Sequence, residues 1–179
     1  MLPTWFEIFP GSEIFNAIFF ILPTLLSNMT PLLFGGGVPM DFRGYWFDDK
    51  RILGDHKTIR GFIAGFMGGF LIGIFSWWWL TNIIEVAYPI PLVNGFFQGI
   101  GTGVGDCVGS FIKRRLNIQP GGSLIVMDQI GFMFFGLLFG RIGTPYPWIY
   151  WLILIPIAFI VHFAANAVGY LLGLKDVWW

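Results

Sequence analysis

The chain has 179 residues, of which 56% are hydrophobic, 20% aromatic and only 11% charged. Because a soluble domain usually carries about 25% charged residues, this composition indicates a membrane protein and argues against a soluble enzyme or binding module. The formal net charge of zero gives no indication of nucleic-acid binding, and the single cysteine, Cys107, excludes an intramolecular disulfide.

Five apolar stretches are long enough for a membrane-spanning helix, which needs about 20 residues. In chain order they cover residues 14–34, 61–80, 91–111, 123–140 and 148–172. Residues 1–12 are too few to span and are a candidate interfacial segment. We therefore predict an all-α fold, a polytopic transmembrane bundle of five spans with two structured cytoplasmic loops, in one integral membrane domain over residues 1–179.

The charged residues are distributed unevenly between the two sides of such a bundle. Nine of the ten Lys and Arg fall in the loops 35–60 and 112–122 or at the C-terminus, and Arg141 lies on the other side. By the positive-inside rule, the N-terminus is outside the cell membrane, and both loops and the C-terminus are cytoplasmic. All seven Asp lie on or next to the cytoplasmic side and all three Glu on the other, which favours a cytoplasmic site built from carboxylates.

Glycine recurs at helical spacing in the second and third stretches, at 61, 65, 69 and 73, at 95, 99 and 103, and at 101, 105 and 109. Small residues every four positions let helix backbones approach closely in lipid, so these stripes predict a tightly packed bundle. A phosphate-binding loop in "GIGTGVGD" is the alternative, but no strand precedes it and no Gly-Lys-Ser/Thr follows. The stripes could pack within one bundle or between protomers, so an oligomer is compatible with them and the oligomeric state stays open.

Asp106 and Asp128, near the cytoplasmic ends of the third and fourth stretches, flank a loop that contains Lys113, Arg114 and Arg115. A carboxylate within a spanning helix costs about 3 kcal/mol at the helix centre and is usually functional. The two Asp would hold Mg²⁺, and the three basic residues would neutralise phosphate oxygens. The alternative is a basic membrane anchor that pairs with the same Asp. Taken together, the five charges favour a metal-phosphate site.

The first cytoplasmic loop adds more charges in "DFRGYWFDDKRILGDHKTIRG" (41–61). Lys57, Thr58 and Arg60 lie at the start of the next helix and are further candidates for phosphate binding, although most such loops are solvated and charge-balanced. In the fifth stretch, His162 and Asn166 share one helix face. Interhelical hydrogen bonding is the favoured interpretation of this pair, and a polar wall of the same cavity is the alternative.

Three short motifs resemble the signature of the membrane CTP-dependent cytidylyltransferases. They are "SFIKRR" (110–115), "PGG" (120–122) and "DQ" (128–129). The archaeal branch of that family, the CDP-archaeol synthases, is more similar still, because "GDHKTIRG" in the first loop and "GLKD" near the C-terminus also resemble its preserved elements. The resemblance covers nearly the whole chain.

This resemblance implies transfer of CMP from CTP to an ether-linked dialkylglycerol phosphate of the geranylgeranyl type in the bilayer, with release of pyrophosphate and with Mg²⁺ as cofactor. The catalytic residues would be Asp106, Lys113, Arg114 and Asp128. The residues expected to bind CTP or its phosphates are Lys57, Thr58, Arg60, Ser110, Lys113, Arg114, Arg115, Gly121, Gly122 and Gln129. The metal ligands would be Asp106 and Asp128, with Asp55 as a further candidate.

Two positions depart from the family's pattern. The bacterial-type signature has a Lys-Asp pair where Asn117 and Ile118 stand, and its closing motif usually has a second acid where Gly131 stands. The number of metal ions therefore stays open. A small transporter or ion channel that uses Asp106 and Asp128 is the competing hypothesis. Against it, both acids lie at one end of their helices, which leaves no charged relay across the bilayer.

Overall fold

In the computed structural model, residues 12–83, 90–119, 122 and 124–171 are described. These residues form five α-helices and no strand beyond two isolated bridges. The helices are α1 (Glu13–Phe34), α2 (Ile59–Asn82), α3 (Ile90–Arg115), α4 (Ile125–Gly143) and α5 (Ile149–Leu171). The predicted all-α class is confirmed for this part of the chain, and each predicted apolar stretch coincides with one helix. The candidate interfacial segment 1–12 lies almost wholly outside the described residues.

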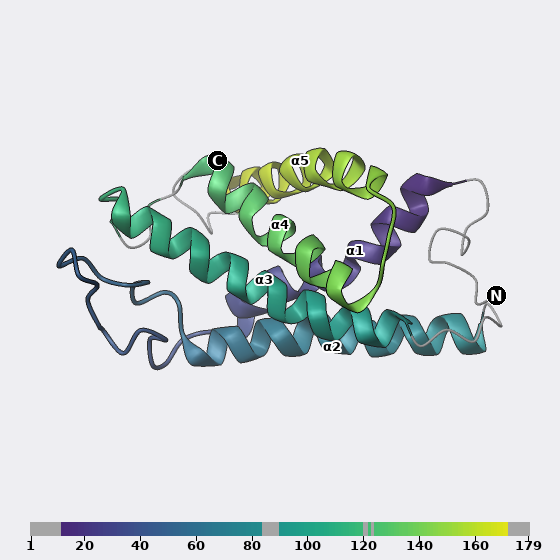
Figure 1. Cartoon of the computed structure of the whole chain (residues 1–179), viewed down its shortest axis with the longest axis horizontal. Helices are drawn as coiled ribbons and strands as arrows, with labels where there is room; N and C mark the ends of the chain where they lie inside the picture. Colours follow the sequence, from purple (N-terminus) through teal and green to yellow (C-terminus); the bar gives the residue numbers. More distant parts are fainter. Residues whose placement is uncertain (1–11, 84–89, 120–121, 123, 172–179) are drawn as a thin grey trace.

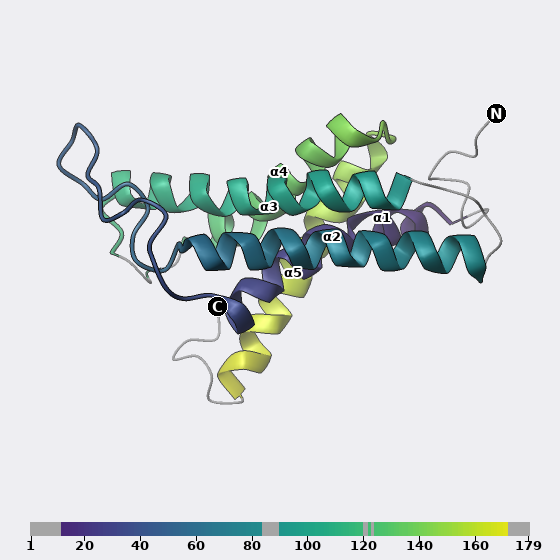
Figure 2. The same cartoon turned by 90° about the horizontal axis from the view of Figure 1, so that it is seen from below.

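Helices α2 and α3 lie side by side along most of their length (Figures 1 and 2). Glycine allows this close approach: a Cβ on Gly69 would lie 2.9 Å from the Gly99 Cα, and one on Gly73 would lie 2.9 Å from the Gly95 Cα. No side chain fits at such distances. The predicted stripes therefore pack α2 against α3 within one chain.

The second glycine stripe of α3 faces a different helix. A Cβ on Gly105 would lie 2.8 Å from the Gly131 carbonyl oxygen of α4, and one on Gly101 would meet the Phe135 carbonyl oxygen. Two stripes on two faces of α3 therefore place this helix between α2 and α4. Since α3 carries Asp106 and the three consecutive basic residues, this central position brings its charges next to both neighbours.

Helix α1 is joined to α3 by buried amides. The Gln98 side chain accepts hydrogen bonds from the Thr24 backbone N–H (3.2 Å) and hydroxyl (2.9 Å), and it donates to the Phe20 carbonyl (3.0 Å). Asn94 donates to the same carbonyl at 3.1 Å. These bonds join α1 to α3 directly beside Pro23, a helix-interior proline that has no N–H to donate. The side chain of Phe20 belongs to an apolar core through which α1 packs on α4 and α5.

The loop between α1 and α2 is ordered. Its two ends pair, because the Met40 N–H donates to the Lys57 carbonyl at 2.7 Å and the Ile59 N–H to the Val38 carbonyl at 3.0 Å. At its centre, the fully buried Asp41 carboxylate accepts hydrogen bonds from Arg51 at 3.0 Å and from three backbone N–H groups. Figure 2 shows this loop at the end of the bundle where α3 ends.

Two of the described helices, α1 and α2, are long and apolar enough to cross a membrane. In α4 and α5 the apolar segments are shorter, Ile130–Gly143 and Ile149–Val161. Large apolar side chains are exposed on the outside of the bundle, among them Leu71, Phe75 and Leu152. A surface of this kind is expected where lipid, and not water, surrounds the helices.

Candidate functional site

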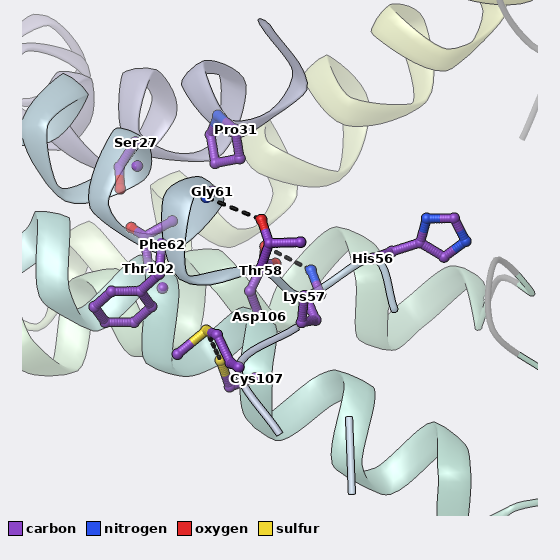
Figure 3. Close-up of a pocket in the computed structure, with 13 residues that line it drawn as sticks. Ser27, Pro31, His56, Lys57, Thr58, Gly61, Phe62, Thr102, Asp106 and Cys107 are labelled. Atoms are coloured by element: carbon purple, nitrogen blue, oxygen red, sulfur yellow. Dashed lines mark hydrogen bonds and ion pairs between the residues drawn. The ribbon is translucent and has the colours of Figure 1, made fainter. Parts of the chain in front are cut away.

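An ion pair joins the first loop to α3. Lys57 is the last loop residue before Thr58, whose hydroxyl caps α2 by accepting a hydrogen bond from the Gly61 N–H at 3.0 Å. The cap fixes where the helix starts and directs Lys57 toward Asp106 on α3, where Lys57 Nζ lies 2.8 Å from Asp106 Oδ2 (Figure 3). Both side chains remain about one-third exposed, at 28% and 34%, so the pair is accessible to a ligand.

A cavity of about 50 Å³ adjoins this pair and lies among α1, α2 and α3. Its walls are made largely of small and apolar residues, including Pro31, Gly61, Gly65 and Gly103. His56 also borders it, but Figure 3 shows its ring directed away from Asp106. The cavity therefore combines one cation and one carboxylate at its mouth with an apolar interior, an arrangement suited to a ligand with a charged head.

A second ion pair joins α3 to α4. Lys113 Nζ lies 2.7 Å from Asp128 Oδ1 and 3.3 Å from the Gly122 carbonyl oxygen. The other oxygen of Asp128 accepts a hydrogen bond from the Leu124 N–H at 3.0 Å, which satisfies a free donor at the start of α4. Asp106 and Lys113 are seven residues apart on one face of α3, about 10 Å along the axis. The two ion pairs are therefore neighbours at one end of the bundle.

The three consecutive basic residues of α3 point to three different places. Lys113 pairs with Asp128, whereas the Arg115 Nη2 donates to the Arg51 carbonyl at 2.6 Å and its guanidinium lies 4.6 Å from the centre of the Phe111 ring. Arg114 is only 6% exposed and donates to the Gln119 carbonyl at 3.1 Å. Sequence reasoning treated these three as one cluster, but successive helix positions are rotated by about 100° and cannot share a face.

Other predicted residues take different positions. Asp55 pairs with Arg51 at 3.1 Å, and no three His, Cys, Asp or Glu side chains of the described residues gather as a metal cluster. The assignment of Asp55 as a further metal ligand beside Asp106 and Asp128 stays a prediction. Ser110 is buried, and Arg60 is exposed in the first turn of α2. Gly121 and the side chains of Gln129, His162 and Asn166 lie outside the described part of the structure.

Sequence reasoning gave no role to Asp41, Lys50 or Arg51. The three lie at the base of the first loop, where Asp41 holds Arg51 and Lys50 Nζ donates to the Arg115 carbonyl at 3.0 Å. The pairing of Asp41 with a residue ten positions away had no periodic signal, because loops follow neither the helical nor the strand repeat. The structure thus adds a layer of loop residues that holds the end of α3.

Mg²⁺ usually takes one or two protein carboxylates and completes its octahedral shell with water and substrate phosphates. Asp106 and Asp128 offer such oxygens, each about one-third exposed and each held by an ammonium group. These groups fit a metal that binds together with phosphate. Each lysine now pairs with a carboxylate, and it could pair with a phosphate oxygen instead when the metal takes its place at the carboxylate. The groups do not fit an ion held by protein ligands alone.

The structure is a helical bundle with an apolar exterior and two Lys–Asp pairs at one end, which is compatible with an intramembrane enzyme that acts on a charged substrate and a lipid. Residues 12–179 match the CarS-like family described as CDP-archaeol synthase. The chain is 36% identical over 172 residues to the CDP-archaeol synthase of Methanocaldococcus jannaschii, covering 93% of this chain and 97% of that one. It is 39% identical over 168 residues to that of Pyrococcus horikoshii, covering 94% and 98%.

A solved structure, of an intramembrane enzyme for archaeal membrane lipid biosynthesis, is also similar, with a TM-score of 0.76 at 32% identity over 86% of this chain and 94% of that one. The chain belongs to the CDP-archaeol synthase family. It is therefore a membrane-embedded CTP-dependent cytidylyltransferase that transfers CMP to a lipid phosphate. The family expected from the motifs is confirmed, and the hypothesis of a transporter or channel is rejected.

Proposed function

We propose that this chain transfers CMP from CTP to an ether-linked dialkylglycerol phosphate of the geranylgeranyl type, in a reaction that depends on Mg²⁺. The products are a CDP-activated lipid and pyrophosphate. The names of the relatives support the lipid class, since they form CDP-archaeol. The Lys57–Asp106 pair at the mouth of the cavity supports a substrate with a phosphate head.

The observation that carries the proposal is the pairing of both candidate carboxylates with lysine, Lys57–Asp106 at 2.8 Å and Lys113–Asp128 at 2.7 Å. Without substrate, the positive and negative charges within each pair neutralise each other. When phosphate groups bind, each lysine can turn to a phosphate oxygen, and each carboxylate is then free to take a cation. The paired state thus keeps the site neutral at the edge of the bilayer until substrate and metal bind together.

In the proposed reaction, an oxygen of the lipid phosphate attacks the α-phosphorus of CTP. A new P–O bond forms, and the bond from the α-phosphorus to the oxygen that bridges to the β-phosphorus breaks. That oxygen keeps the electron pair and leaves with pyrophosphate. A metal bound by Asp106 and Asp128 would neutralise the charge on the phosphates. Lys57 holds the lipid phosphate, and Lys113 stabilises charge on the nucleotide phosphates.

No strong general base is required for this reaction, because a phosphate monoester is already ionised at neutral pH. Among the described residues, His56 borders the cavity with its ring directed away from Asp106 (Figure 3). Positioning and neutralisation of charge supply the catalysis, as in other phosphoryl and nucleotidyl transfers.

The proposed topology has five spans, with the N-terminus outside and with the loops 35–60 and 112–122 and the C-terminus in the cytoplasm. It is supported by the positive-inside distribution of Lys and Arg. It is also supported by the gathering of both Lys–Asp pairs at the end where the first loop meets α3 (Figure 2). CTP is water-soluble, and this end would face the cytoplasm that contains it.

The experiment that tests the proposal incubates the detergent-purified protein with labelled CTP and unsaturated dialkylglycerol phosphate, with Mg²⁺ or with EDTA. We expect a labelled CDP-lipid and an equal amount of pyrophosphate, with neither formed in EDTA. A diacylglycerol phosphate with ester links serves as the matched lipid control. Equal rates with ether and ester lipids would contradict the proposed lipid class, and full activity in EDTA would contradict the metal requirement.

A further inference from the structure

The first loop presents aromatic side chains on the outside of the protein. Phe47 is 95% exposed, Phe42 is 73% exposed, and Tyr45 between them is also exposed. Rings in contact with water would be expected to pack inward, because burial of a phenylalanine side chain stabilises a fold. An exposed apolar surface of this kind marks a site that binds a partner or a membrane.

The outward position of Phe47 is built into an ordered hairpin. The Trp46 N–H donates to the Lys50 carbonyl at 2.9 Å and closes the hairpin below its tip. The Trp46 ring lies edge-on to the Phe111 ring of α3, with the ring centroids 5.4 Å apart. The Lys50 ammonium donates to the Arg115 carbonyl at 3.0 Å. Because the hairpin is fixed to the end of α3 in this way, Phe47 stays on the outside.

The turn that carries Phe42 has an unusual sequence for its backbone. The Gly44 N–H donates to the Asp41 carbonyl at 2.6 Å, and the two residues between them, Phe42 and Arg43, have positive φ angles of 46° and 63°. Turns with positive φ at both central positions favour Asn and Gly, because a side chain disfavours this conformation. A large ring in this turn, left exposed, is expected where it contacts something outside the chain.

The length of α2 places the first loop at the depth of the lipid head groups. Trp77 and Trp78 are exposed near the end of α2 that is remote from the loop, and tryptophan is enriched at the interface between a membrane and water. Trp78 follows Ile59, the first residue of α2, by 19 positions. At 1.5 Å per residue this is about 28 Å, close to the roughly 30 Å of a hydrocarbon core. The first loop lies just beyond the start of α2 (Figure 2).

Exposed apolar residues also lead from α1 into the loop. The last turn of α1 exposes Leu32, Leu33 and Phe34. This end of α1 lies beside the start of α2, because a Cβ on Gly35 would lie 3.9 Å from the Gly61 Cα. Val38 is exposed in the segment that leads to Phe42. The apolar side chains of the loop therefore continue those of the membrane-facing helices, which favours lipid as their partner over a soluble protein.

We propose that the aromatic surface of the first loop, formed by Phe42, Tyr45 and Phe47, binds the head-group layer of the bilayer on its own side of the membrane. The rings enter the boundary between head groups and hydrocarbon, where aromatic side chains are favoured. Arg43 lies beside Phe42 and forms no ion pair with a carboxylate among the described residues. Its guanidinium can bind lipid phosphate. The first loop is thus an interfacial anchor as well as a link between two helices.

Anchoring of the loop also fixes the depth of Lys57 in the membrane. The Met40 N–H donates to the Lys57 carbonyl at 2.7 Å, and Met40 is two residues before Phe42. A loop held in the head-group layer therefore keeps the Lys57 ammonium near the level of lipid phosphates. This consequence rests on the proposed function, whereas the contact of the aromatic surface with the bilayer does not.

The test attaches a nitroxide to single cysteines and measures its collisions with oxygen, which concentrates in the bilayer, and with a water-soluble nickel chelate. The full-length protein carries Cys107→Ala, which removes its single native cysteine, and thermal unfolding checks its fold. It is reconstituted in vesicles of phosphatidylcholine and phosphatidylglycerol. Phe47→Cys reports on the aromatic surface, and Leu71→Cys is the bilayer reference, because Leu71 is exposed at the middle of α2. Asp49→Cys is the matched control, because Asp49 is an exposed acidic residue of the same hairpin.

We expect the label at position 47 to collide more often with oxygen, and less often with the nickel chelate, than the label at position 49. Its depth should be smaller than that of the label at position 71. Equal nickel collision rates at positions 47 and 49 overturn the proposal, because Phe47 then faces water. Protection of position 47 from both reagents also overturns it, and assigns the surface to a second protein chain.

A second measurement tests the consequence for Lys57. Phe47→Ser is expected to raise the KM of the lipid phosphate presented in vesicles by about fivefold, with the KM of CTP unchanged. Phe47→Trp keeps a ring suited to the interface and should match the wild type. Equal lipid KM values in all three proteins overturn the link between the aromatic surface and Lys57. The collision measurement needs no turnover, so contact with the bilayer can be shown even if the wild type forms no CDP-lipid, and the two proposals can fail separately.

Discussion

Lys57 and Asp106 are 49 positions apart in the sequence and form an ion pair of 2.8 Å between Nζ and Oδ2. A pair that is about one-third exposed on both sides contributes little to stability, on the order of 0–1 kcal/mol. Its position at the mouth of a cavity, next to the end of α3, suits a role in binding and catalysis better than a role in folding. Function and stability should therefore respond differently when the pair is changed.

Asp106→Asn is expected to lower kcat/KM for CDP-lipid formation by at least about 100-fold, because an amide cannot hold the cation that neutralises the phosphates. The free energy of unfolding should change by less than about 1 kcal/mol. The measurement is steady-state kinetics, together with thermal unfolding in detergent. Asp49→Asn is the control, because Asp49 is an exposed aspartate of the first loop. Parallel losses of stability and activity in Asp106→Asn would assign the pair a structural role instead.

Lys113→Ala is expected to raise the KM of CTP by about tenfold or more, because a charged donor to the nucleotide phosphates is lost. The KM of the lipid phosphate should stay within twofold of the wild type, since the lipid phosphate is held at Lys57. Initial rates over a matrix of both substrate concentrations give the two constants. Lys113→Arg, which keeps the charge, is the matched control and should recover most of the CTP affinity. A rise confined to the lipid KM would reverse the assignment of the two lysines.

The helices could be predicted from the sequence because lipid-facing segments are apolar over about 20 residues. The glycine stripes predicted their packing, and Gly69 against Gly99 confirms it. The directions of charged side chains could not be predicted in this way. Whether Asp106 pairs with Lys113 or with Lys57 depends on how a loop folds back onto α3, and loop geometry leaves no periodic pattern in the sequence.

Gly69→Val is expected to destabilise the protein by about 3 kcal/mol or more. A Cβ there would lie 2.9 Å from the Gly99 Cα and 3.1 Å from the Pro23 carbonyl oxygen. These are backbone atoms that cannot move without separating α2 from its neighbours, and overpacking of a rigid interface costs about 1–3 kcal/mol or more. Thermal unfolding in detergent measures the loss. Gly109→Val is the matched control, since a Cβ at Gly109 would meet only the flexible Met127 side chain at 3.5 Å. Equal stability of the two variants would show that α2 and α3 are not in close contact.

Asp41 organises the first loop, so the stability of the loop at low pH should depend on the protonation of the Asp41 carboxylate. Burial raises the pKa of Asp41, but hydrogen bonds from Arg51 and from the backbone N–H groups of Gly54, Leu53 and Arg43 outweigh burial and hold it well below its usual range. A carboxylate with a lowered folded-state pKa stabilises the fold fully above its unfolded pKa of about 3.9. The stabilisation is lost as the pH falls through the lower folded pKa. The loop should therefore keep its structure throughout the pH range of an enzyme assay.

Asp41→Asn is expected to loosen the loop at pH 7, by about 1.5–3 kcal/mol, because it removes a charged hydrogen-bond acceptor of Arg51. Hydrogen exchange of residues 38–58 measures this change, and Asp49→Asn is again the control. Below pH 4 the difference between wild type and Asp41→Asn should shrink, because the carboxyl of the opened loop then takes up a proton while that of the folded loop, with its lowered pKa, still does not. Because the Met40 N–H holds the Lys57 carbonyl at 2.7 Å, a looser loop also places Lys57 less well, and activity should fall with protection. A variant that exchanges faster and keeps full activity would separate the loop from the site and would contradict the role given to Lys57.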